Sequence, residues 1–277
     1  MQSAARRLFK LLIEQPDSEI DLGRAALSIA AEEYPTLDTQ AYIRKLDRLA
    51  ERVRRTAEQS SRVGRLAALI DLLANVEGFS GNRAAYDDPR NSFLNEVLDR
   101  KIGIPISLSL IYVLVGWRAG LPMWGVAFPG HFLARCDLDD GFVIIDAFGS
   151  GRQLSLEDCR RLLRSTQRGS VFDATLLEPA TNRGILFRML ANLKAAYLRR
   201  GDLGRALSAL DRMLLIAPDH PSVWRDRGLL HLKLGRYPHA LSDLDRYQEL
   251  DPDRALGDSP VLAASALMRR GKSQLLN

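Results

Sequence analysis

The sequence predicts an α+β fold built from three successive regions. Residues 1–75 repeat apolar positions at spacings of three and four, which is typical of helices. Residues 76–180 hold one long apolar run and then short runs rich in Val, Ile, Phe and Trp, which predict a central helix on a small antiparallel sheet. Residues 185–277 repeat themselves, which predicts a helical array. A chain of 277 residues exceeds one typical domain, in agreement with several regions.

The N-terminal region is expected to form helices that pack on the core. Asp17-Ser18-Glu19 and Thr36-Leu37-Asp38-Thr39 resemble helix starts, and Pro35 ends the segment before the second of them. The stretch YIRKLDRLAERVRR places four apolar side chains on one stripe, namely Ile43, Leu46, Leu49 and Val53. This pattern predicts a surface helix that buries one face.

The middle region begins with a loop and continues into the predicted central helix. FSGNRAAYDDPRNS clusters turn-forming residues, and FLNEVLDR follows as a short helix. Pro105 suits the first turn of the next helix, and Gly120 with Pro122 suits its end. Because the residues between them are apolar on all sides, we expect this helix at the centre of its domain.

Three strands are expected after the central helix. The runs MWGVAF, HFLARC and GFVIIDAF are rich in strand-forming residues. The segment DLDDG separates the last two and is typical of a hairpin turn.

The C-terminal region carries a period of 34 residues. Four pairs share this spacing, and Trp224-x-x-x-Gly228 matches the start of the second repeat; the pairs are Gly201 and Gly235, Ala206 and Ala240, Leu210 and Leu244, and Pro218 and Pro252. This is the signature of the tetratricopeptide repeat (TPR), a pair of antiparallel helices. Residues 260–271 are expected to form a capping helix. Since two repeats are fewer than the about three that an independent array needs, we expect them to pack against the middle region.

Composition indicates an ordinary globular protein, with 46% hydrophobic and 26% charged residues. Its net charge is +5, from 39 basic residues, of which 33 are Arg and 6 are Lys, and 34 acidic residues. Arg suits phosphate or carboxylate recognition. Acidic residues are interleaved with the basic ones, and no stacking aromatics accompany them. This arrangement favours solvated charge over a nucleic-acid surface.

Further classes of protein are disfavoured by the residues present. Cys136 and Cys159 provide neither a disulfide framework nor metal-ligand spacing, so no metal and no cofactor are expected. The N-terminus lacks the apolar core of a signal peptide, and no run approaches the about 20 apolar residues that span a bilayer. We therefore expect a cytoplasmic protein without a membrane partner. Nothing in the sequence indicates an oligomeric state.

His131 is the histidine that the pattern sets apart. It follows Pro129-Gly130 at the start of one predicted strand, and Asp146 ends the next. Folding the two strands about their turn places His131 opposite Asp146 or one step diagonal to it. At cross-strand distances of about 5 Å, an imidazole–carboxylate hydrogen bond can form. Such a pair orients a catalytic base, although a purely structural histidine on a hairpin has the same pattern.

A nucleophile for this pair is harder to assign. Cys136 lies an odd number of residues from His131 on the same strand, so it points to the opposite face, and Cys159 belongs to an amphipathic helix. Both are expected in the core. Ser107 and Ser109 lie near the start of the central helix. Their hydroxyls either react there or bond to backbone carbonyls.

A family resemblance narrows these alternatives. The middle region resembles the transglutaminase-like branch of the papain-like fold, in which Gly-Val-Cys starts the central helix and a His and an Asp come from neighbouring strands. Gly103-Ile104-Pro105 occupies the Gly-Val-Cys place, and Gly120-Leu121-Pro122 occupies the place that closes the helix. His131 and Asp146 match the His and the Asp. The nucleophile position therefore holds Pro105, which has no nucleophilic atom.

DPRNS, GIPISLS and PGHF, together with the trailing repeats, resemble the bacterial SirB-type family. That family joins a transglutaminase-like domain to C-terminal TPRs, and the resemblance covers nearly the whole sequence. It implies a transglutaminase-like core and a TPR module, but no settled activity. Our main hypothesis is a catalytically lapsed domain that acts in protein binding or regulation. The alternative is a hydrolase or acyltransferase on amide or ester bonds that uses His131 and Asp146 with Ser107 or Ser109.

Two further sets of residues complete the predicted sites. The loop before the central helix is expected either to flank the His131 site or to form a rigid turn and helix cap; its polar residues are Asp88, Asn91 and Ser92. The TPR helices are expected to present a concave surface for a protein or peptide. Its basic residues favour an acidic peptide, or they are solvated surface charge; they are Arg188, Arg199, Arg225 and Lys233.

Overall fold

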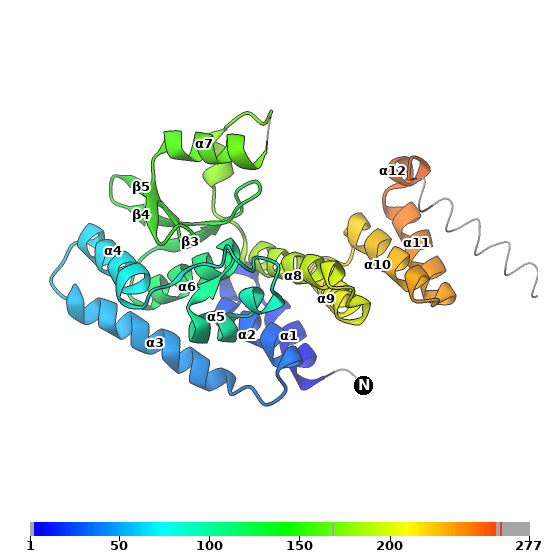
Figure 1. Ribbon diagram of the computed structural model, residues 1–277, viewed down its shortest axis with the longest axis horizontal. Helices are drawn as coiled ribbons and strands as arrows, with labels where there is room; N and C mark the ends of the chain where they lie inside the picture. Colours follow the sequence, from blue (N-terminus) through cyan, green and yellow to red (C-terminus); the bar gives the residue numbers. More distant parts are fainter. Residues whose placement is uncertain (1–2, 168, 259–260, 262–277) are drawn as a thin grey trace, which may run out of the picture. The chain divides into compact units, whose positions relative to one another are not determined.

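A computed structural model describes residues 3–167, 169–258 and 261 of the chain (Figure 1). It divides into two compact units, Met1–Met189 and Leu190–Asn277. The N-terminal helices and the sheet-containing core share the first unit. The observed fold is mostly helical with small sheets, so the predicted α+β class is confirmed. The proposed division near residue 75 stays a prediction.

The first unit begins with helices that cover the core. They are α1 (Ala4–Ile13), α2 (Leu22–Glu33), α3 (Thr39–Thr56) and α4 (Arg62–Ile70), with a 3₁₀ turn at Asp17–Glu19 and a π-helical turn at Asp71–Val76. Helix α3 begins where the sequence predicts, because the Asp38 carboxylate accepts the Ala41 N–H at 3.0 Å. Its apolar stripe is buried at Leu46, Leu49 and Val53.

The predicted helix start at Asp17 forms a 3₁₀ turn, Asp17–Glu19, and α2 begins only after it. Asp21 caps α2 by accepting the Arg24 N–H, so this helix begins four residues later. Asp17 accepts the backbone N–H groups of Asn182 and Arg183 at 2.8 and 2.9 Å, at the start of α8 (Asn182–Arg199). A carboxylate suits either helix start, and only the tertiary fold decides which helix it caps.

Helix α6 (Pro105–Arg118) is the centre of the first unit (Figure 1). Every residue from Pro105 to Gly116 is buried. Neighbours include α3, α4, the short helix α5 (Leu94–Arg100) and the sheet. Pro105 takes the first helical position, and the helix ends before Gly120, whose φ of +79° suits a residue without Cβ.

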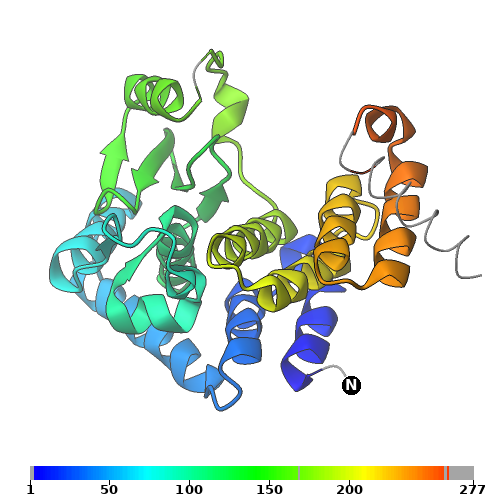
Figure 2. The same ribbon diagram turned by 45° about the vertical axis from the view of Figure 1, so that its right-hand side comes forward.

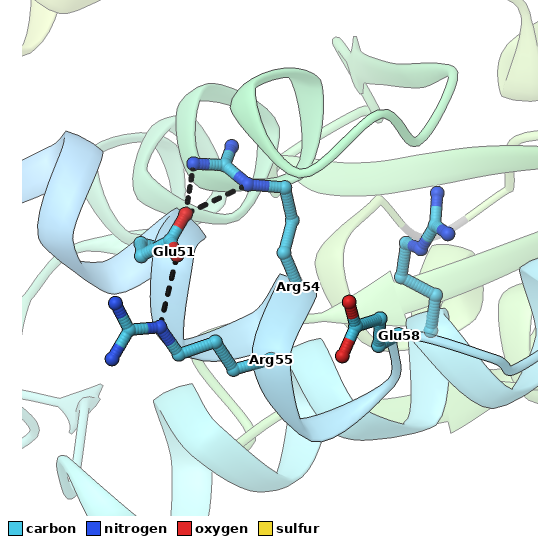
Figure 3. Close-up of a pocket in the computed structure, with 5 residues that line it drawn as sticks. Glu51, Arg54, Arg55 and Glu58 are labelled. Atoms are coloured by element: carbon cyan, nitrogen blue, oxygen red, sulfur yellow. Dashed lines mark hydrogen bonds and ion pairs between the residues drawn. The ribbon is translucent and has the colours of Figure 1, made fainter.

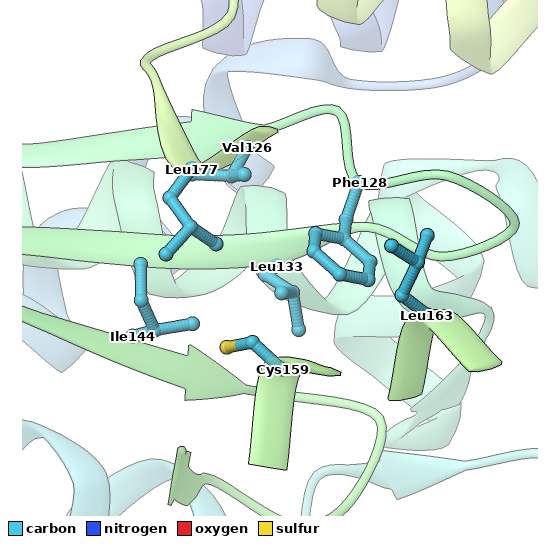
Figure 4. Close-up of a cluster of buried hydrophobic side chains, with 7 residues drawn as sticks. All are labelled: Val126, Phe128, Leu133, Ile144, Cys159, Leu163 and Leu177. Atoms are coloured by element: carbon cyan, nitrogen blue, oxygen red, sulfur yellow. The ribbon is translucent and has the colours of Figure 1, made fainter. Parts of the chain in front are cut away.

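The sheet has four antiparallel strands in the order β3-β4-β5-β6. Their bounds are Met123–Val126, Leu133–Leu138, Gly141–Asp146 and Arg152–Leu154. Figure 2 shows the sheet between α6 and α7 (Leu156–Thr166). Under α7 the strands bury a cluster in which Phe128, Leu133 and Ile144 meet Cys159 and Leu163 (Figure 4).

The strands differ from the prediction in one starting residue and in their number. The expected strand HFLARC begins at Leu133 rather than His131, because the His131 N–H bonds the Phe128 carbonyl at 3.0 Å within a turn. Gly130 adopts a φ of +69° in that turn. Strand β6 and the short parallel pair β1 (Ser80–Gly81) and β2 (Ile102–Gly103) were not predicted, because runs of two or three residues carry no periodic signal.

The second unit consists of helix pairs. After α8 come α9 (Leu203–Ile216), α10 (Pro221–Lys233), α11 (Tyr237–Leu250) and α12 (Pro252–Leu256). Gly201 and Gly235 stand 34 residues apart, and both have a φ near +70° directly after a helix. The predicted repeat is confirmed. Of the predicted capping helix 260–271, only Val261 belongs to the described residues, and it packs with Ala240 and Leu244.

Close packing between α10 and α11 makes Gly228 a sensitive position. A Cβ added there would lie 2.7 Å from Leu244 Cδ2 and 3.2 Å from the Asp243 Cβ, whereas at Gly204 in α9 the nearest atom is 3.8 Å away. We expect Gly228→Ala to lower the free energy of unfolding by about 1–3 kcal/mol through overpacking. Gly204→Ala, the matched control, should raise it by about 0.5–1 kcal/mol through helix propensity. Urea denaturation measures both, and equal effects would contradict the packing.

Candidate functional site

His131 and Asp146 form the polar centre of the candidate site. The imidazole Nε2 lies 2.9 Å from Asp146 Oδ1, and both side chains are largely buried, with exposed fractions of 11% and 17%. Asp146 ends β5, and His131 ends the turn before β4. The register pairs Ala134 with Ile145, so His131 lies diagonal to Asp146 rather than directly opposite.

The carboxylate of Asp146 is held by several donors. Its Oδ1 also accepts the Phe148 N–H at 3.1 Å, and the Gly149 N–H contributes a further hydrogen bond. Burial by itself would raise the pKa of the Asp146 carboxyl. The hydrogen bond and charge of His131, with the two backbone donors, outweigh burial and hold the pKa below its usual value. Asp146 is therefore ionised at neutral pH.

This geometry assigns the two imidazole nitrogens. An ionised carboxylate accepts hydrogen bonds only, so Nε2 carries the proton that it donates to Asp146. In the neutral ring the lone pair then belongs to Nδ1. No hydrogen-bond partner of Nδ1 is found in the described part of the protein. His131 is thus oriented as a base or a hydrogen-bond acceptor.

Phe148 forms the wall beside the imidazole, a role that the sequence did not reveal. Its ring meets the rings of His131 and Tyr86 edge to face, each at a centroid distance of 6.0 Å. The Arg83 guanidinium lies 4.8 Å from the Phe148 centroid. Gly81 admits the ring, since a Cβ there would lie 2.5 Å from it. These residues lie near the sequence motifs described above. An aromatic residue or an Arg in a loop is, however, too common to indicate a functional role.

Tyr112 contributes a second group that the sequence left unassigned. It is fully buried, and its hydroxyl has no hydrogen-bond partner among the described residues. Burial, and then the negative charge of Asp146, raise the pKa of this phenol. Pro105, Ser109 and Tyr112 recur at helical spacing on α6, so one face of the helix presents all three.

Both serines are buried and bonded to backbone carbonyls. Ser107 Oγ donates to the Asn91 carbonyl at 2.6 Å and accepts the Ile104 N–H at 3.1 Å. Ser109 Oγ donates to the Phe132 carbonyl at 3.2 Å. Each is 0% exposed, and neither hydroxyl bonds His131 in the described structure. The two alternatives for these hydroxyls were reaction and hydrogen bonding to backbone carbonyls, and the geometry corresponds to the second.

The polar loop residues hold the loop itself together. Asp88 caps the 3₁₀ turn Pro89–Ser92 through the Arg90 N–H and pairs with the Arg90 guanidinium. Asn91 accepts from the Asn82 amide at 3.0 Å and donates to the Ala85 carbonyl at 2.7 Å. Ser92 is buried in the same turn. The hydrogen bonds of Asp88 and Asn91 given above correspond to the turn-and-cap alternative.

The two thiols lie in the core. Cys136 and Cys159 are 0% exposed, and burial raises the pKa of both to about 11. Both therefore stay protonated at neutral pH. Within the described residues, no group of three or more His, Cys, Asp or Glu is placed to hold a metal ion.

A charged depression elsewhere in the first unit has a structural explanation (Figure 3). It has a volume of about 640 Å³ and lies at the end of α3, lined by Glu51, Arg54, Arg55, Glu58 and Arg65. Arg54 donates to the Arg118 carbonyl and Arg65 to the Ala119 carbonyl. These cations thus complement the C-terminal end of α6, where helix carbonyls lack partners.

The four basic residues predicted for partner binding differ in environment. Arg188 belongs to the first unit and is half-buried, whereas the other three belong to the second. Arg225 pairs with Asp258 and Asp226, which neutralise it. Lys233 is exposed and forms no ion pair with a described residue, and Arg199 is exposed but engaged in an interaction. The ion pairs of Arg227 with Asp211 and Asp243 were not predicted, because these residues belong to different helices that meet only in the folded protein.

Comparison with known proteins agrees with this architecture. Residues 40–191 match the transglutaminase-like superfamily, and residues 193–264 match the tetratricopeptide repeat. The protein belongs to the transglutaminase-like superfamily. No solved structure was found to match it. None of the described helices combines the length and apolarity needed to cross a membrane.

Two bacterial proteins are similar in sequence to more than two thirds of this chain. A UPF0162 protein of Xylella fastidiosa (strain 9a5c) is 41% identical over 88% of this chain and 89% of its own length. One from Vibrio cholerae is 33% identical over 68% and 70%. Human F-box only protein 21 is 34% identical over 68% of this chain, but over only 32% of its own length. The names of these relatives do not carry the SirB-type label, which stays a prediction.

The His131–Asp146 pair predicts a pH-dependent contribution to stability. Because folding lowers the pKa of Asp146, its carboxylate stabilises the fold above the unfolded-state pKa of about 4. This contribution disappears as the pH falls through the folded-state pKa. Asp146→Asn should lower the free energy of unfolding by about 1.5–3 kcal/mol at pH 7 and by much less near pH 3. Urea titrations across this range provide the measurement.

The matched control for this prediction is Asp140→Asn. Asp140 is exposed in the hairpin turn and has no described partner, so its replacement should have little effect at either pH. A stability loss in Asp146→Asn that stays constant between pH 7 and pH 3 would contradict the ionic role of Asp146.

Proposed function

We propose that this protein is a non-catalytic transglutaminase-like protein that acts as a protein-binding or regulatory module. The observation that carries the proposal is Pro105 at the first position of α6. In the motif that this region resembles, the same position holds the nucleophilic cysteine. Proline offers no thiol or hydroxyl, so acyl transfer through this position is chemically impossible.

The remaining candidate nucleophiles support the proposal. Ser107 and Ser109 are buried and donate their protons to backbone carbonyls, and Cys136 and Cys159 are buried and protonated at neutral pH. His131 and Asp146 then serve to bind a ligand, because Nδ1 offers an acceptor without a neighbouring group to deprotonate.

The repeat region supports a protein partner. Stacked TPR helices form extended concave surfaces that bind peptides. Ion pairs within the second unit compensate the charge of arginines such as Arg225 and Arg227. Lys233, which is exposed and forms no ion pair with a described residue, then favours an acidic partner.

The alternative is a hydrolase or acyltransferase on amide or ester bonds with a displaced serine. Ser109 favours it most, since it lies one turn from Pro105 on the same face of α6 and bonds the carbonyl next to His131. Labelling of the wild-type protein by a fluorophosphonate, lost in both Ser109→Ala and His131→Ala, would favour this alternative over the binding module.

Restoring the missing thiol tests the non-catalytic proposal. In Pro105→Cys, the new thiol at the start of α6 should be a thiolate at pH 7.5, because His131 and the helix N-terminus favour that form. Ultraviolet difference absorbance measures the thiolate without requiring a reagent to reach this buried position. Adding His131→Ala should raise the pKa of the new thiol by about one unit, which lowers its ratio of thiolate to thiol about tenfold. The wild-type protein should show no thiolate at this pH. Equal pKa values of the new thiol with and without His131 would contradict the assignment of Pro105 to the nucleophile position.

Charge reversal tests the repeat surface. Arg199→Glu combined with Lys233→Glu should abolish capture of partners that the wild-type protein retains, because both side chains are exposed. His131→Ala should retain them, since this residue belongs to the other unit. Circular dichroism checks that each variant is folded. Partners that survive the charge reversal but not His131→Ala would move the binding role from the repeats to the core.

A further inference from the structure

Arg83 lies beside the candidate site, and the fold does not explain its position. Its guanidinium lies 4.8 Å from the centroid of Phe148, the ring that also contacts His131. Its side chain belongs to the loop between β1 and the 3₁₀ turn and is exposed. Because Phe148 contacts both residues, Arg83 and His131 lie within reach of one short peptide.

The charge of Arg83 is not compensated by an ion pair within the described residues. Arg90, in the same loop, differs, because Asp88 accepts two of its N–H groups at 2.9 and 2.7 Å. Cation–π contact with Phe148 restrains Arg83 without using any hydrogen-bond acceptor. The donors of its guanidinium therefore remain available to a ligand.

The groups around Phe148 differ in the ligand chemistry that they accept. Arg83 provides donors for an anion, and His131 Nδ1 provides an acceptor for an N–H group. Phe148, which contacts both residues, and the exposed ring of Tyr86 beside it provide an apolar surface.

We propose that this set, the Arg83 subsite, binds a peptide carboxylate while a backbone N–H of the same peptide donates to His131 Nδ1. A single guanidinium matches the planar carboxylate with two parallel hydrogen bonds, whereas phosphate sites usually assemble more donors. The carboxylate comes from an acidic side chain or from the C-terminus of the peptide, which share this chemistry. The inference rests on the proposed function, in which the His131 site binds a peptide without transforming it.

Histidine NMR on the full-length protein tests the subsite. The protein is labelled with ¹⁵N-histidine, and the ring signals of His131 are assigned by their loss in His131→Gln. N-acetylglutamate N-methylamide is titrated as the side-chain probe, and N-acetylglycine as the C-terminal probe. We expect at least one to shift the His131 signals saturably. The neutral probe N-acetylglutamine N-methylamide should bind at least about tenfold more weakly.

Variants connect the shift to Arg83. Arg83→Gln should weaken binding of the acidic probe by about tenfold or more. Arg48→Gln is the matched control, because Arg48 is exposed on α3 and has no described ion pair. It should leave the titration unchanged. Phe148→Leu, which removes the ring that restrains Arg83, should weaken binding as well.

The outcomes separate this inference from the proposed function. Equal binding of acidic and neutral probes, an unchanged titration in Arg83→Gln, or no shift of His131 by either acidic probe would overturn the subsite. Inorganic phosphate that produces the same Arg83-dependent shift would overturn the assignment to carboxylates. The proposed function fails on a different observation, namely chemical conversion of a probe or the serine labelling described above.

Discussion

The burial of α6 is the constraint on which the first unit depends. This helix is apolar on all sides and is enclosed from Pro105 to Gly116. At about 1.5–3 kcal/mol for each large apolar side chain removed from water, its burial outweighs any single polar contact in the unit. The N-terminal helices and the sheet can therefore be understood as the cover that one apolar helix requires.

Enclosing α6 also constrains the polar groups of the candidate site that lie against it. The fully buried polar groups there, such as Ser107, Ser109 and Asn91, have to find partners within the protein. The Ser107 hydroxyl donates to the backbone carbonyl of Asn91 in the loop before α6, and the Ser109 hydroxyl donates to that of Phe132, the residue after His131. The two serines that resemble nucleophiles in the sequence thus connect α6 to the backbone of neighbouring segments.

Much of this arrangement was predictable, and the limits follow from separation along the sequence. Pro105 as a helix start, Gly120 as its end and the 34-residue repeat depend on local backbone conformation or periodicity, which the sequence carries directly. The hydrogen bonds of Asp17 to the start of α8 were not predicted, because Asn182 lies 165 residues away in the sequence. Phe148, Arg83 and Tyr86 were missed for the same reason, since their contacts join a β-turn to a distant loop.

The sequence by itself determined the fold class, the repeat and the absence of a nucleophile at Pro105, because these depend on residue type and spacing alone. Only the tertiary structure decided which nitrogen of His131 bonds Asp146, which carbonyls the two serines bond, and which ring lies beside the imidazole. The physical reason is that side-chain hydrogen bonds and ring contacts are directional. They depend on positions of a few ångströms that packing sets and that spacing along the sequence does not encode.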